Sequence, residues 1–161
     1  MSLSVNLRHL AAHSLRLQGE LPAAELDIET RDAVIEFTDP AEYDLEVEQL
    51  EGGLLVQGEL HVVLNCKCVR CLKPFVHRLE LNPWTCHVPL RDEDAAPVVN
   101  DRVDLTPFVR EDILLAFPQH PLCEPDCRGL PIAGLGHASK SAGGPTEASS
   151  PAWAELNKLK F

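Results

Sequence analysis

The stretch LLVQGELHVVL, residues 54–64, decides the fold. Its apolar side chains recur at every second position, and polar side chains occupy much of the alternate set. The apolar set is Leu54, Val56, Leu60, Val62 and Leu64, with Gly58 at the same spacing, and the polar set is Gln57, Glu59 and His61. A two-residue period is typical of a strand with one dry and one wet face. The stretch therefore predicts a strand that packs one face on a core.

Neighbouring segments extend this pattern in both directions. YDLEVEQL, residues 43–50, alternates in the same way, and Glu51, Gly52 and Gly53 then predict the turn of a β-hairpin. Further β-rich runs are SLRLQGEL at 14–21, AVIEF at 33–37 and FVHRLELNPWTCHVPL at 75–90. We expect a mainly antiparallel sheet of about five to six strands.

The pattern changes at Val103, where a helix is expected near 106–117. Thr106 is a suitable N-cap, Pro107 suits the first helical position, and Pro118 would end the helix. Val109, Ile113, Ala116 and Phe117 recur at helical spacing. This helix should cover the dry face of the sheet, which makes the fold class α+β. The polar segment 91–100 is expected to be a mobile connection.

Three regions are expected along the chain. Residues 1–136 form a single β-rich domain, and residues 137–150, which are small and polar, predict a flexible linker. Residues 151–161 regain helical character, with an apolar stripe at Trp153, Leu156 and Leu159. Such a tail helix either docks on a partner or folds back onto its own domain, and both alternatives stay open.

The net charge of −11 is unevenly distributed. Residues 20–59 hold thirteen acidic side chains and only Arg31 as a counter-charge. Residues 65–79 hold no carboxylate and carry four cations, Lys67, Arg70, Lys73 and Arg78. The overall sign excludes nucleic-acid binding by the whole surface, so these four cations either contact a partner locally or offset thiolate charge.

Neither a membrane span nor a signal peptide is evident. No apolar run approaches the roughly 20 residues that a bilayer requires, and the first fourteen residues lack a long apolar centre. We expect a cytoplasmic protein with no membrane contact. In that reducing compartment, the six cysteines are expected to be thiols or metal ligands rather than disulfides.

Four of the cysteines form two closely spaced pairs. Cys68 and Cys71 make a C-x-x-C turn, and Cys123 and Cys127 make a C-x-x-x-C turn. Two thiolate pairs suit a structural, tetrahedral Zn²⁺ that would join the loop after the helix to the sheet. Two other ligands remain in competition, since Cys66 can replace Cys68 and His120 can replace a cysteine. Cys86, inside a strand, is expected to be a buried apolar residue.

Enzymatic alternatives have weaker support. A thioredoxin-like C-x-x-C lies at a helix N-terminus, whereas here Cys71 is followed by Leu72, Lys73, Pro74 and a strand. A catalytic zinc keeps an open coordination position, which two cysteine pairs would fill. We therefore expect no enzyme and no small-molecule substrate. A thiol-redox enzyme, a zinc-dependent enzyme and a small protein-binding adaptor remain as alternatives.

Three motifs together resemble the YceD family, the large ribosomal RNA subunit accumulation proteins. They are C-x-R-C-x-K-P-F at 68–75, REDILLAFPQHPLCEPDCRG at 110–129 and PAWAELNKLK at 151–160. The resemblance implies a non-catalytic role in 23S ribosomal RNA accumulation or processing. The partner would be ribosomal RNA, reached by the cations of 65–79, or a ribosomal or assembly protein. Many members carry a further cysteine pair where this chain reads CRGLPIAGLG.

Overall fold

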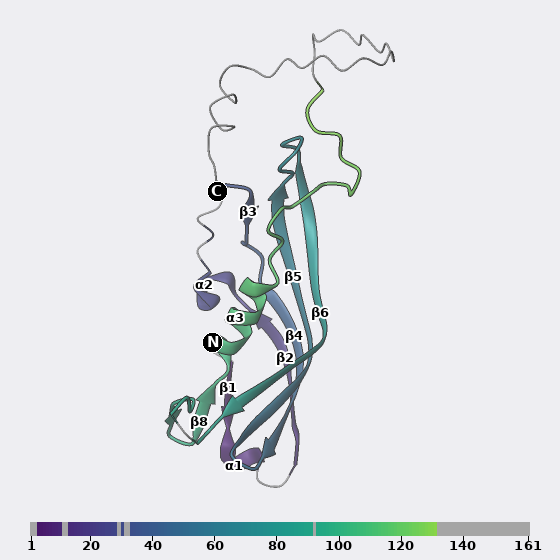
Figure 1. Cartoon of the computed structure of the whole chain (residues 1–161). Helices are drawn as coiled ribbons and strands as arrows, with labels where there is room; N and C mark the ends of the chain where they lie inside the picture. The colour runs from purple at the N-terminus through teal and green to yellow at the C-terminus, as the bar shows by residue number, and fades with distance from the viewer. Residues whose placement is uncertain (1–2, 11–12, 29, 31–32, 92, 132–161) are drawn as a thin grey trace, which may run out of the picture. The chain divides into compact units, whose positions relative to one another are not determined.

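The fold is built around β5 (Gly53–Lys67), the strand that contains the 54–64 stretch. The structure is a computed structural model that describes residues 3–10, 13–28, 30, 33–91 and 93–131 (Figure 1). Among these residues the class is α+β with antiparallel sheets, as predicted, and it comprises eight strands and three helices rather than five to six strands and one principal helix. The other elements are β1 (Ser4–Asn6), α1 (Leu7–Leu10), β2 (Leu15–Leu21), α2 (Ala23–Leu26), β3 (Ile35–Glu36), β4 (Ala41–Leu50), β6 (Pro74–Pro89), β7 (Val98–Val99), β8 (Arg102–Asp104) and α3 (Thr106–Leu115).

The larger sheet has β5 in its interior. β4 pairs with β5 from Glu42↔His61 to Leu50↔Gly53, which confirms the predicted hairpin. β6 pairs with the other side of β5 along nearly its whole length, β2 pairs with β4, and β3 pairs with the far end of β5. The five-stranded antiparallel arrangement therefore agrees with the prediction.

Of two predicted strands, β6 has the length of its sequence signal and β3 is shorter than its signal. β6 continues through the cis bond between Asn82 and Pro83, and its pairing with β5 shifts register between Gly58 and Leu60. The AVIEF run contributes only the two residues of β3. Pairing with β5 sets the length of both strands, because a strand ends where the neighbouring strand no longer supplies hydrogen bonds.

A second, three-stranded sheet was not predicted. It has the order β1-β8-β7, with Val5 opposite Val103 and Val98 opposite Val103 on the other side. The segment 91–100, expected to be only a connection, therefore contains the short strand β7. Strands of two or three residues are too short to show a two-residue period.

The helix α3 confirms the predicted helix and covers the dry face of the larger sheet (Figure 1). Val109 and Ile113 are fully buried, and the Trp84 Nε1–H on β6 donates to Asp112 Oδ2 at 2.7 Å. The expected cap was wrong. Leu105 occupies the N-cap position, while Asp104 Oδ1 accepts from the Thr106 backbone N–H at 2.9 Å. Ala116 lies at the C-cap rather than on the helical stripe.

Thr106 has a different function from the one expected. Its hydroxyl Oγ1 accepts a hydrogen bond from the Leu3 backbone N–H at 3.0 Å, so it anchors the N-terminal segment beside α3. Apolar side chains from both sheets and the helices form one core beneath α3. Its largest fully buried members are Leu21, Leu26, Leu45, Leu54, Leu60, Leu64, Leu105 and Ile113.

The predicted linker and tail lie outside the described residues. The expectations for 137–150 and for Trp153, Leu156 and Leu159 therefore stay predictions, as do the domain boundaries. Within the described part of the chain, no helix combines the length and the apolar character needed to cross a membrane.

Candidate metal centre

The loop between β5 and β6 holds the first cysteine pair. The Cys68 backbone N–H donates to the Lys73 carbonyl at 2.9 Å, and the Leu72 N–H donates to the Cys68 carbonyl at 2.8 Å. Leu72 adopts a left-handed backbone with φ of 61°. This tight turn directs the side chains of Cys68 and Cys71 to the same place at the hairpin end.

The chain after α3 brings the second pair to this loop. The Val69 N–H donates to the Pro121 carbonyl at 3.0 Å, and Arg70 Nη1 donates to the Cys127 carbonyl at 2.9 Å. Gly129, with φ of +86°, supplies the left-handed turn that follows Cys127. One backbone–backbone hydrogen bond and one from a side chain to a backbone carbonyl thus join two segments about fifty residues apart, without any contribution from a metal.

The four sulfur atoms lie close enough to share one ion. Cys68 Sγ is 3.7 Å from Cys127 Sγ, and Cys71 Sγ is 3.6 Å from Cys123 Sγ. All four Sγ atoms lie within 4.8 Å of one another. A tetrahedron of thiolates with Zn–S bonds of about 2.3 Å has edges of about 3.8 Å. The four cysteines could therefore hold a metal ion, and their donor chemistry fits Zn²⁺.

Backbone N–H groups surround these sulfur atoms. The N–H of Cys123, together with those of Cys71 and Arg70, lowers the pKa of Cys68 to about 6, against the effect of burial. Contact with Cys71 raises the pKa of Cys123 to about 12, assisted by burial. The Gly129 N–H acts to lower the pKa of Cys127, but burial and the Cys71 and Cys68 sulfurs outweigh it, so the pKa rises. N–H donors aimed at sulfur stabilise thiolates, which are the form that binds metal.

The competing ligands do not join the cluster. Cys66 lies on the core side of β5, 2% exposed, and burial raises its pKa. Cys86 packs partly buried against the core, and burial together with the charges of Asp112 and Glu111 raises its pKa. His120 is exposed on the segment before the second pair and is not among the clustered ligand groups.

The four cations predicted as one basic group in 65–79 lie in two different places. Lys67, Arg70 and Lys73 lie at the hairpin end, and Arg70 uses one N–H on the Cys127 carbonyl. Arg78 lies farther along β6, opposite Val63, and lines a hollow with Glu42 and Glu80. Sequence reasoning missed a further cation at the hairpin end, Arg128, although it directly follows Cys127.

Opposite charges balance at this end of the hairpin. Four thiolates and one Zn²⁺ carry a formal charge of about −2. Glu124 and Asp126 add two negative charges from the second cysteine segment, against Lys67, Arg70, Lys73 and Arg128. The cations can therefore offset the charge of a filled metal centre. This was one of the two interpretations of the sequence, the other being local contact with a partner.

Comparisons with known proteins agree with the motifs. The family described as "Large ribosomal RNA subunit accumulation protein YceD" matches residues 56–160. Uncharacterized proteins of Mycobacterium bovis and Mycobacterium tuberculosis are each 32% identical over 125 residues, or 72% of this chain and 60% of theirs. An uncharacterized protein of Mycobacterium leprae is 28% identical over 154 residues, which cover 90% of this chain and 70% of that protein.

The matched regions cover different shares of this chain and of its relatives. The chain spans about 60% of the length of the first two relatives. No solved structure matches it. The family match covers well over half of the chain and includes both cysteine pairs. The chain belongs to the YceD family.

Proposed function

We propose that this protein is a non-catalytic factor in biogenesis of the large ribosomal subunit, acting in the cytoplasm. It supports accumulation or processing of 23S ribosomal RNA by binding that RNA or a ribosomal or assembly protein. Membership of the YceD family, whose description names large-subunit ribosomal RNA accumulation, is the observation that carries this proposal. The closed arrangement of four thiols favours a structural over a catalytic metal, because a catalytic zinc needs an open position.

In this proposal a structural Zn²⁺ joins the β5–β6 loop to the segment after α3. Cys68, Cys71, Cys123 and Cys127 would hold the ion. Few apolar side chains are buried at this end of the hairpin, where Val69 is 39% and Leu72 is 59% exposed. A metal ion would therefore supply stabilisation that the local core does not.

Zinc stoichiometry tests the metal assignment directly. Elemental analysis of the full chain, purified without chelator or metal-affinity resin, should find one zinc per chain. Cys68→Ser and Cys123→Ser should both lose it, because each removes a ligand from a different segment. Cys86→Ser is the matched control and should keep the zinc, since Cys86 lies outside the cluster. A wild-type protein without zinc would contradict the assignment and favour the thiol-redox alternative.

Lys67 and Lys73 are the best candidates for an RNA contact at the hairpin end. Both are exposed, whereas Arg70 also stabilises the second cysteine segment, so charge reversal of Arg70 would confuse folding with binding. A gel shift with a 23S ribosomal RNA fragment should weaken in a Lys67→Glu, Lys73→Glu double variant and show salt dependence. Arg91→Glu with Arg102→Glu changes the net charge equally, away from the cysteines. Equal weakening in both double variants would contradict a local contact.

The cellular role has its own test. Loss of the gene should lower the ratio of 23S to 16S ribosomal RNA, and the wild-type chain should restore that ratio. An unchanged ratio would contradict the proposed function, whatever the metal content of the protein.

A further inference from the structure

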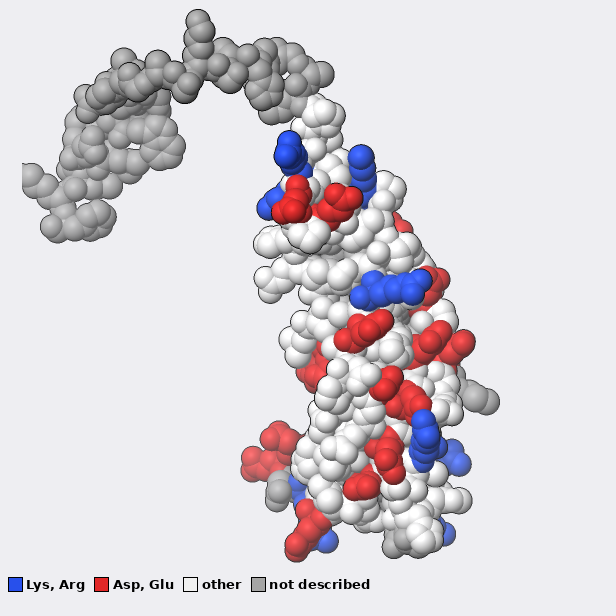
Figure 2. All heavy atoms as spheres, turned by 90° about the vertical axis from the view of Figure 1, so that its right-hand side faces the viewer, with Lys and Arg blue, Asp and Glu red and all other residues white. Residues whose placement is uncertain are grey.

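The outer face of the larger sheet, opposite α3, is strongly acidic. Register places on it the alternate residues of β2, β4, β5 and β6 that point away from the core. Its charged members are seven carboxylates and three cations: Glu20, Glu42, Asp44, Glu46, Glu48, Glu59 and Glu80, with Arg16, Arg78 and, at the hairpin end, Lys67. Figure 2 shows acidic side chains spread over much of one side of the molecule, with basic side chains near both of its ends and one between them. We call this surface the acidic sheet face.

The requirements of the fold do not account for this concentration of charge. Asp44 lies directly opposite Glu59, and Glu20 lies directly opposite Glu42. Like charges that are directly opposite in a sheet destabilise it, because their side chains lie about 5 Å apart. Arg16 offsets this repulsion at Asp44, but within the described residues no ion pair does so at Glu20 and Glu42, where a cationic partner would relieve it.

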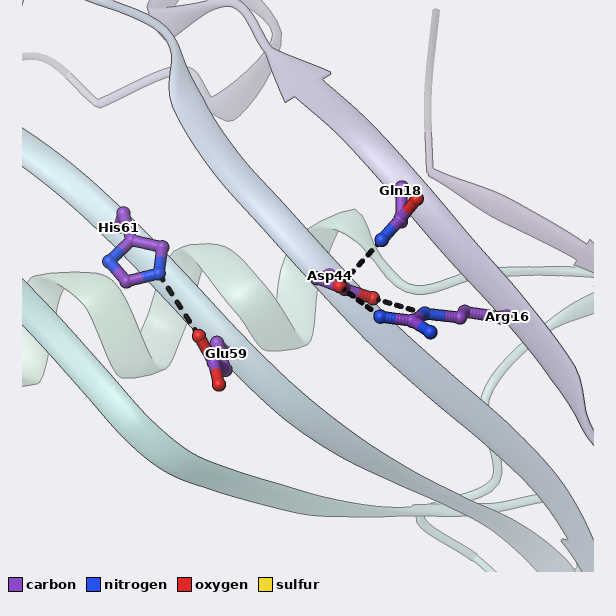
Figure 3. Close-up of polar contacts among 5 residues, drawn as sticks. All are labelled: Arg16, Gln18, Asp44, Glu59 and His61. Carbon is purple, nitrogen blue, oxygen red and sulfur yellow. Dashed lines mark hydrogen bonds and ion pairs between the residues drawn. The ribbon is translucent and has the colours of Figure 1, made fainter.

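The face neutralises only part of this charge internally. Arg16 makes a bidentate pair with Asp44, from Nε to Oδ1 at 2.8 Å and from Nη2 to Oδ2 at 2.6 Å, and Gln18 donates to Oδ2 at 2.6 Å (Figure 3). His61 Nε2 lies 3.3 Å from Glu59 Oε2. The side chains of Glu42 and Glu46 are exposed, and among the described residues the lysine at the outward positions of the four strands is Lys67, at the hairpin end of β5.

The face is also hollowed in a way that suits long cationic side chains. One hollow of about 400 Å³ is lined by Gly58 and Gln57, by Asp44, Glu46 and Glu59, and by Arg16. Another of about 380 Å³ includes Glu42 and Glu80 together with the apolar Val63. Arg78 and Leu79 also line this second hollow. Lysine and arginine bury an apolar stem and present a charged head, so a hollow where apolar side chains lie beside carboxylates, as the second one does, fits them.

We propose that the acidic sheet face binds a lysine- and arginine-rich polypeptide segment of a partner protein. This inference rests on the proposed function, which requires a macromolecular partner, and it specifies the chemical class of that partner. RNA is unsuited to this face because seven carboxylates would repel its phosphates. Complementary charge would chiefly raise the association rate and set the binding register.

A short fluorescein-labelled lysine-rich peptide is the probe. We expect it to bind the full chain in low salt, with affinity reduced about tenfold in a Glu42→Gln, Glu46→Gln double variant. The control double variant, Glu93→Gln with Glu111→Gln, removes the same charge from exposed positions outside the face and should change affinity less than about twofold. Equal losses in the two double variants, or no loss in either, would overturn the proposal.

Two further arms complete the experiment. Thermal unfolding midpoints of the two double variants should agree, which would show that a loss of binding is not a loss of folding. If the Glu42→Gln, Glu46→Gln variant misfolds, Glu80→Gln alone replaces it and should also lower the affinity for the peptide. A single-stranded RNA probe whose binding is lost in the face variant would overturn the proposal. The peptide assay uses purified protein, whereas the 23S to 16S ratio is read in cells, so failure of either can be told from failure of the other.

Discussion

The sheet body and the cysteine end of the β5–β6 hairpin are stabilised by different means. In the body, Leu45, Val56 and Leu60 have no exposed surface and belong to one hydrophobic core with Val109 and Ile113 of α3. At the cysteine end, Leu72 and Leu130 are 59% and 57% exposed, and backbone hydrogen bonds with four clustered thiols join the two segments. One long hairpin thus extends from a region that a hydrophobic core stabilises into one that we expect a metal to stabilise.

The largest expected effect lies in the body, at Gly58. Its φ is +152°, and an added Cβ would overlap the Asp44 carbonyl oxygen and lie 2.9 Å from Leu45 Cα. Both are backbone atoms of the neighbouring strand, so no side chain can move aside. We expect Gly58→Ala to lower the free energy of unfolding by about 3 kcal/mol, measured by urea denaturation.

Gly52→Ala is the matched control for this substitution. Gly52 also has a positive φ, of +88°, but nothing lies within 4 Å of an added Cβ. Only the left-handed backbone then opposes the substitution, at a cost of about 1 kcal/mol. Similar costs at the two glycines would mean that backbone strain, not close packing of β4 on β5, limits position 58.

Metal removal should increase local opening at the cysteine end but not in the sheet body. With a chelator present, hydrogen exchange of the Val69 and Leu72 amides should accelerate at least tenfold. The Val69 N–H bonds to Pro121 on the other segment, and the Leu72 N–H bonds to Cys68 within the turn whose two cysteines would hold the metal. Amides in the β4–β5 ladder should keep their protection. Equal acceleration in both regions would show that body and cysteine end unfold as one cooperative unit.

Single substitutions check the same separation without a chelator. Cys71→Ser removes one clustered thiol and should reproduce the exchange pattern of metal removal. Cys86→Ser, on β6 but outside the cluster, should leave the hairpin end protected. Fast exchange at the hairpin end in Cys86→Ser would contradict the assigned ligand set.

The body could be predicted from sequence because its signals are local and periodic. Alternation over residues 43–64 indicates two strands and their turn, and the structure confirms both. The second sheet could not be predicted, because β1, β7 and β8 have two or three residues each and form only when distant segments meet. Thr106 shows the same limit, since its hydroxyl accepts from Leu3, more than a hundred residues away.

The cysteine cluster was predictable because two close pairs on turns are a strong signal even at long separation. Spacing could not exclude Cys66, since only the strand register shows that it faces the core. Charge runs were less informative. The Asn65–Leu79 cations looked like one group, but Arg78 extends from the outer face of β6, and Arg128 joins the hairpin end from another segment.

The smallest expected effect concerns the surface of the body, where charge contributes less than the core. Hydrogen bonds from Arg16, and then Gln18, hold the pKa of Asp44 at about 2, below its ordinary 3.8. Because the folded pKa is depressed, the associated stability is present above pH 3.8 and is lost as pH falls through about 2. Arg16→Ala should raise the Asp44 pKa toward 3.8 in a carbon-13 carboxylate titration, whereas Arg102→Ala, away from Asp44, should leave it unchanged. An unchanged Asp44 pKa in Arg16→Ala would mean that Gln18 alone holds the carboxylate.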